Sequence, residues 1–138
     1  MIAALLVCGC SKSSDLDAQA RKPFDVLRRS VRKEMSDSSR VVAMLARVDT
    51  LEQRSLELIR ATRAERDSLI RMYADRSVED AALLNRFRDD ERQRAERRRS
   101  LLDARVRLKS IASPAEWAAM SNAETKAMNQ VAALTRGK

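Results

Sequence analysis

Apolar residues recur every three or four positions between residues 38 and 76, and no glycine or proline interrupts them. This spacing places them on one side of an α-helix and is typical of helices that pair as coiled coils. At about 1.5 Å per residue, the helix is expected to be roughly 55–60 Å long. The repeat positions are Val41, Met44, Val48, Leu51, Ser55, Leu58, Thr62, Glu65, Leu69 and Met72, with Leu45, Ile59 and Tyr73 widening the stripe.

A second long helix is predicted to follow and to run to about Ala112. Ser77 is expected to cap its start, with Glu79 and Asp80 supplying the acidic first turn that a helix favours. A turn near residues 75–77 makes the two long helices antiparallel neighbours. Folding about that turn pairs Leu69–Tyr73 with Leu83–Phe87, and Val41–Leu51 with Leu101–Ile111.

Shorter helices are predicted on either side of this hairpin. Pro23 suits the first position of a helix whose apolar face carries Phe24, Leu27, Val31 and Met35. Near the other end, Ser113 and Glu116 match a capping box around Pro114, and Ser121–Glu124 offers a second start for the same helix. The predicted fold is therefore all-α, an elongated antiparallel long-helix hairpin with short flanking helices, coiled-coil-like in its packing.

The middle of the hairpin departs from the apolar repeat. Residues 88–99 hold one apolar side chain, Ala95, among six arginines and four acids. One interpretation is a solvent-spanning helix with ion pairs four residues apart, each contributing about 0.2–0.5 kcal/mol. A second is a surface that binds a negative group or a partner, and a third is a polar layer that fixes the helix register. The ion pairs expected are Arg86–Asp90, Asp90–Arg94 and Arg92–Glu96, and the candidate binding residues are Arg97, Arg98 and Arg99.

The amino-terminal stretch Ile2–Val7 is apolar and is followed by Cys8, Gly9 and Cys10. This pattern resembles a bacterial lipoprotein signal, in which an aliphatic residue stands three before the modified cysteine and a small one directly before it. Val7 and Gly9 occupy those places for Cys10. The resemblance implies that Cys10 becomes the first residue and carries acyl chains such as palmitate. The missing basic residues before the apolar run are explained if the true start lies upstream.

The lipoprotein resemblance also sets the expected domain boundaries and location. Residues 1–9 form the signal peptide, 10–22 a lipid-anchored polar tether, and 23–138 the helical domain. Ser11 after the cysteine implies sorting to the outer membrane, with the domain on the periplasmic side of the cell envelope. No stretch has the eighteen or more apolar residues of a transmembrane helix, so Cys10 is the expected anchor.

Composition narrows the chemistry. The chain has no histidine, and both of its cysteines lie within the first ten residues. The usual general base, the commonest metal ligand and a disulfide framework are therefore missing, and we expect no enzyme, no cofactor and no metal site. The net charge of +8 favours an anionic partner, and the exposed stripes favour a homodimer.

The stretch from Ile111 to Trp117 carries a further resemblance. It is similar to a Thr-Pro-Glu-Glu-Trp-like turn in uncharacterised helical envelope proteins of proteobacteria, and more loosely to the helix-capping motif of Spy/CpxP-like periplasmic chaperones. Together these features predict an acylated envelope protein, a non-enzymatic helical interaction or scaffolding module with an Arg-rich surface and a chaperone-like character. The alternative is a cytoplasmic basic helical protein that binds nucleic acid through phosphate contacts.

Overall fold

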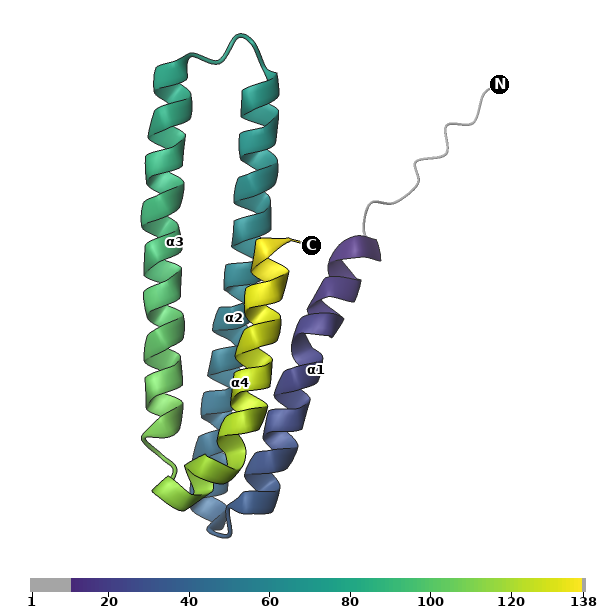
Figure 1. Cartoon of the computed structure of the whole chain (residues 1–138), viewed down its shortest axis with the longest axis vertical. Coiled ribbons are helices and arrows are strands. Elements are labelled where there is room, and N and C mark those ends of the chain that lie inside the picture. The colour runs from purple at the N-terminus through teal and green to yellow at the C-terminus, as the bar shows by residue number, and fades with distance from the viewer. Residues whose placement is uncertain (1–10, 138) are drawn as a thin grey trace, which may run out of the picture.

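The computed structural model describes residues 11–137, and their side chains from Asp15 onward. This part of the chain is all-helical, as the sequence predicts, and Figure 1 shows four helices lying along one long axis. The helices are α1 (Ser11–Glu34), α2 (Ser38–Ala74), α3 (Asp80–Lys109) and α4 (Pro114–Arg136).

The two long helices α2 and α3 form the predicted antiparallel hairpin. Asp37 caps α2, its carboxylate accepting hydrogen bonds from the backbone N–H groups of Ser39 (2.9 Å) and Arg40 (3.0 Å). At the connecting turn, Asp75 accepts from the Ser77 N–H at 2.9 Å. The expectation that Ser77 caps α3 was wrong: the cap position is Glu79, without a side-chain bond, because Ser77 is used in the turn.

The two helices are joined in their middle by Glu65 on α2, which pairs with Arg94 and Arg97 on α3. On one side of this point, Arg47 and Arg54 of α2 line a hollow together with Ser100 and Arg107 of α3. On the other side, Leu69 and Ile70 line a cleft together with Phe87. Both neighbourhoods are consistent with the predicted pairing of the segments.

Helix α1 begins at Ser11, so the predicted start at Pro23 was wrong, and residues 11–22 of the predicted tether are helical. Ala20 and Phe24 are both buried, and Leu16 packs against the same core, which continues the apolar face one turn at a time toward the amino terminus. Pro23 lies inside the helix and lacks the N–H of that turn. The buried face compensates for the missing hydrogen bond.

Helix α4 starts at the predicted capping box. The Ser113 hydroxyl accepts from the Glu116 N–H, and the Glu116 carboxylate accepts from the Ser113 N–H at 2.8 Å. The helix does not restart at Ser121, whose hydroxyl bonds back to the Ala118 carbonyl at 3.1 Å. Glu124 of the expected second box instead turns into the core.

Helices α1 and α4 pack against each other and against α2, but they cover only part of the hairpin. Asp17 of α1 pairs with Arg60, and α4 ends where the Arg66 side chain lies against Gly137. We call α1, α4 and the parts of α2 and α3 beside them the body. Residues 67–92, the end of the hairpin that extends past α4 in Figure 1, are the projecting segment.

Candidate binding cleft

A layer of charged side chains interrupts the apolar contact between α2 and α3. Glu65, only 5% exposed, pairs with both Arg94 and Arg97. One turn farther out, the buried Asp90 accepts from Arg86 at 3.1 Å. Arg94, Arg97 and Asp90 occupy positions of the α3 stripe that would otherwise be apolar, so the polar middle of the hairpin lies inside the helix pair rather than on its outer surface.

The predicted ion pairs have mixed outcomes. Arg86–Asp90 is present, with 3.0 Å between Nε and Oδ1. Arg92 pairs with Asp89 at 3.6 Å instead of with Glu96. Arg94 pairs with Glu91 and Glu65 instead of with Asp90, because Arg94 belongs to the inward stripe and reaches across to α2.

Several other arginines hold helices together. On α3, Arg105 donates to the fully buried Glu124 of α4, with one hydrogen bond at 3.0 Å, and this hydrogen bond raises the Arg105 pKa. On α2, Arg40 donates to the Ile111 carbonyl at 2.8 Å and to Glu116. The hydrogen bond from the Ser113 N–H, followed by that from Arg40, holds the pKa of Glu116 below its ordinary value. Much of the arginine content is therefore structural.

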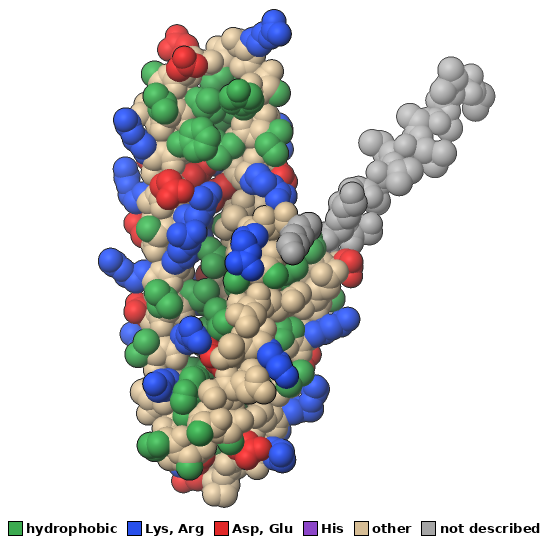
Figure 2. Space-filling view, in the orientation of Figure 1, with side chains coloured by type: hydrophobic (Ala, Val, Ile, Leu, Met, Phe, Trp, Pro, Cys, Tyr) green, Lys and Arg blue, Asp and Glu red, His purple; other side chains and the backbone are tan. Residues whose placement is uncertain are grey.

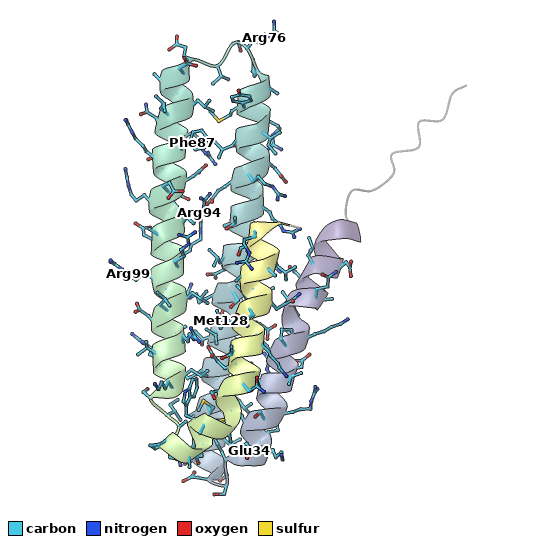
Figure 3. The ribbon with its side chains drawn as sticks, in the orientation of Figure 1. Glu34, Arg76, Phe87, Arg94, Arg99 and Met128 are labelled. Atoms are coloured by element: carbon cyan, nitrogen blue, oxygen red, sulfur yellow. The ribbon has the colours of Figure 1, made fainter. Side chains whose placement is uncertain are left out.

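A cleft of about 480 Å³ opens where α4 ends against the hairpin. Its lining combines apolar side chains with guanidinium groups and contains no carboxylate. Figure 3 shows Phe87 and Arg94 directed from α3 toward α2 at this level. The lining residues are Leu58, Thr62, Arg66, Leu69, Ile70, Phe87, Arg94, Arg98, Thr135 and Arg136.

The structure separates the three arginines that the sequence grouped. Arg97 points inward to Glu65 and to Gln93, the latter at 2.9 Å. Arg98 lines the cleft. Arg99 is exposed and points away from α2 in Figure 3. Successive residues on a helix diverge by about 100°, so three neighbours in sequence cannot share one face.

Of the ten residues that line the cleft, only Arg98 was a predicted binding residue, and the sequence analysis did not single out Arg66, Ile70, Thr135 or Arg136 at all. A seven-residue count along α3 would have placed Phe87 and Arg94 on one line, but Arg136 comes from a different helix and reaches the cleft only through tertiary packing. Cys10, the expected lipidation site, lies outside the described residues.

The cleft offers binding surface rather than a reactive group. Its guanidinium groups can neutralise a negative charge, and its apolar side chains can bury part of the same partner. Within residues 11–137, no cluster of three carboxylate or thiol side chains could hold a metal ion. No helix in this range is long and apolar enough to cross a bilayer.

A second hollow, beside α1, shows what is particular about this cleft. It is lined by Arg21, Arg28 and Arg60 together with Asp49, Glu52 and Glu57. Arg28 bonds to Asp49 at 2.7 Å and to the buried Glu52, so charges of both signs meet within it. The lining of the α4 cleft includes four arginines and no carboxylate. Two of these arginines pair with carboxylates outside the lining, Arg94 with Glu65 and Glu91, and Arg66 with Asp67.

Comparison with known proteins gives no match: no protein-family model, no curated protein and no solved structure is significantly similar to this chain.

Proposed function

We propose that this protein is a lipid-anchored, non-enzymatic interaction module of the bacterial envelope, held at the membrane by acyl chains on Cys10. The observation that carries the proposal is the arginine-lined cleft at the base of a projecting hairpin whose apolar side chains are exposed. Such a surface suits a partner that is both apolar and negatively charged. The chain would act by holding that partner close to the membrane.

The distribution of the arginines supports a protein partner over a nucleic acid. Arg86, Arg92, Arg94, Arg97 and Arg105 of α3 all pair with carboxylates within the fold. Phosphate binding depends on cations that are free to neutralise the backbone. Arg98, in contrast, lines the same cleft as Phe87 and Ile70. Mixed apolar and arginine surfaces are the usual centres of protein interfaces.

The position of Cys10 next to α1 supports a short, stiff connection to the membrane. The helix begins at Ser11, directly after the proposed acylation site. An anchor there would restrict the distance between body and bilayer more than a flexible tether would. Two or more acyl chains on one cysteine would give stable attachment, whereas a single chain holds a protein only marginally.

The anchor is tested by replacing Cys10 in the natural host. We expect Cys10→Ser to abolish incorporation of radiolabelled palmitate and to release the protein from the membrane fraction. Cys8→Ser is the matched control and should change neither result. Palmitate labelling or membrane attachment that persists in Cys10→Ser would overturn the anchor.

The binding surface is tested by photo-cross-linking in the same cells. A photoreactive residue at Phe87 should give a discrete adduct, whereas the same residue at Val106 should not. Val106 is an exposed apolar residue of the same helix that lies outside the cleft. Equal labelling from both positions, or none from Phe87, would remove the cleft from the proposal.

A further inference from the structure

The projecting segment leaves large apolar side chains in solvent. Ile70 is 60% exposed, Tyr73 82%, Leu84 56% and Phe87 47%. Figure 2 shows apolar side chains gathered on α2 and α3 near the turn that connects them, on the face that is toward the viewer. Scattered apolar residues are normal on a protein surface, but a contiguous apolar patch marks an interaction site.

The charges of the projecting segment differ from those of the rest of the chain. Residues 67–92 contain five arginines and seven carboxylates, whereas the whole chain carries a net charge of +8. The end of the hairpin is therefore slightly acidic and the remainder strongly basic. The four arginines that line the cleft lie at the border between these two regions; they are Arg66, Arg94, Arg98 and Arg136.

The two signs of charge are spaced symmetrically along one face of α3. Asp80, Phe87, Arg94 and Arg98 follow steps of seven, seven and four residues, so they lie on one side of the helix. Asp80 and Arg98 stand nine residues on either side of Asp89, about 13 Å in each direction.

From this arrangement we infer that the occupant of the cleft is a second copy of this chain. Two projecting segments lie antiparallel about a two-fold axis at the level of Asp89, so that the acidic end of each hairpin meets the arginine-lined cleft of the other. Such a contact is isologous, because both subunits contribute the same surface, and it limits the assembly to a dimer. It covers the apolar patch and keeps the basic bodies apart. This inference rests on the proposed function, because it names the partner of the same cleft.

The test is a charge exchange followed by sedimentation velocity. The protein used is the full chain with Cys8→Ser and Cys10→Ser, which contains no thiol and no acyl group. We expect this protein to dimerise. We expect Glu79→Lys/Asp80→Lys to weaken dimerisation roughly tenfold or more, and Arg98→Glu/Arg136→Glu to do the same, because like charges then face each other twice. An equimolar mixture of the two variants should restore the dimer.

The matched control is Arg29→Glu/Arg32→Glu, which reverses two exposed arginines of α1 at the far end of the body. It should leave dimerisation unchanged, and circular dichroism should show the same helicity in every variant. A monomeric parent protein, or a dimer that both cleft and tip variants retain, would overturn the inference. Recovery in the mixture excludes loss of folding as the cause.

Failure of this inference and failure of the proposed function give different results. If the cleft instead takes another protein of the envelope, the parent sediments as a monomer while Phe87 still cross-links to a different chain in cells. If the anchor is wrong, Cys10→Ser leaves the fractionation unchanged while the charge exchange still works in solution.

Discussion

The body and the projecting segment are made from the same two long helices, yet they are stabilised differently. In the body, α1 and α4 complete a core that contains Phe24, Leu51, Leu108 and Met120, all nearly fully buried. In the projecting segment, α2 and α3 have only each other, and Phe87 stays half exposed. A two-helix contact can bury one narrow stripe per helix, and the wider apolar face is left over. The difference shows that the hairpin is longer than its own fold requires.

Charged pairs also divide between the two regions. In the body, buried carboxylates such as Glu124 and Glu52 connect different helices to arginines. Toward the projecting segment, Asp90 pairs with Arg86 of its own helix. Pairs between helices hold tertiary structure, whereas pairs within one helix stabilise that helix alone. The body is therefore expected to be the cooperative unit, and the projecting segment the part that opens first.

The largest expected difference comes from the two phenylalanines. Phe24→Ala should lower the free energy of unfolding by about 3–5 kcal/mol, because it creates a cavity in the core of the body. Phe87→Ala should lower it by about 1 kcal/mol, since half of that side chain is already in water. Urea denaturation at low protein concentration, followed by circular dichroism, measures both. Equal losses would mean that the two regions unfold as one equally packed unit.

The charged layer at Glu65 tests the border between the regions. Glu65→Ala should destabilise the fold by about 1–3 kcal/mol, because Arg94 and Arg97 keep their charges without their partner. Replacing Glu65, Arg94 and Arg97 together with leucine should be neutral or stabilising by about 1–4 kcal/mol. Thermal unfolding of the two variants checks the sign. A triple variant less stable than Glu65→Ala would show that the layer contributes net stability.

The role of this layer in register is checked separately. With leucine at all three positions, the stripes of α2 and α3 become apolar throughout and can pair one heptad out of step. Amide hydrogen exchange should then show less uniform protection along the hairpin even where the unfolding temperature rises. Unchanged protection would assign the layer no role in specificity.

A smaller effect is expected at the cap of α4. Ser113→Ala removes the hydroxyl that accepts from the Glu116 N–H and should cost about 1 kcal/mol, with Ser113→Asp restoring most of it. Because the cap belongs to the body, the loss should appear in global unfolding. Ser77→Ala, which changes the turn of the projecting segment, is the comparison and should alter only local hydrogen exchange. A global loss in Ser77→Ala would contradict the independence of the two regions.

The sequence predicted the helices better than it predicted the tertiary contacts between them. The Ser113 capping box and the α2 stripe depend on residues close in the chain, and both are as expected. Pro23 led to a wrong helix start, because the local sequence does not distinguish a proline at the start of a helix from one inside a packed helix. The buried face around Ala20, which extends the helix toward the amino terminus, is a tertiary feature. The candidate arginines were chosen for being consecutive, but a helix directs Arg97 inward and Arg99 outward. The cleft needs Arg136 from α4, which no local pattern places beside Phe87.

The smallest effects are expected when the pH is lowered, and they also distinguish the body from the projecting segment. Hydrogen bonds from the Ser113 backbone, and then from Arg40, lower the pKa of Glu116 in the body, and those from Ser77 lower the pKa of Asp75 in the projecting turn. A carboxyl whose pKa is lower in the folded than in the unfolded protein contributes stability above its unfolded pKa, and this contribution is lost as the pH falls through the folded value. Both groups should therefore stabilise the protein at neutral pH and lose that effect in acid.

In Glu116→Gln the global unfolding free energy should fall less between neutral and acidic pH than in the parent. In Asp75→Asn that dependence should be unchanged, while the amides around the turn lose their pH-dependent protection. A pH dependence of global unfolding that falls equally in both variants would mean that the turn is coupled to the body, and the projecting segment would then be part of the cooperative fold.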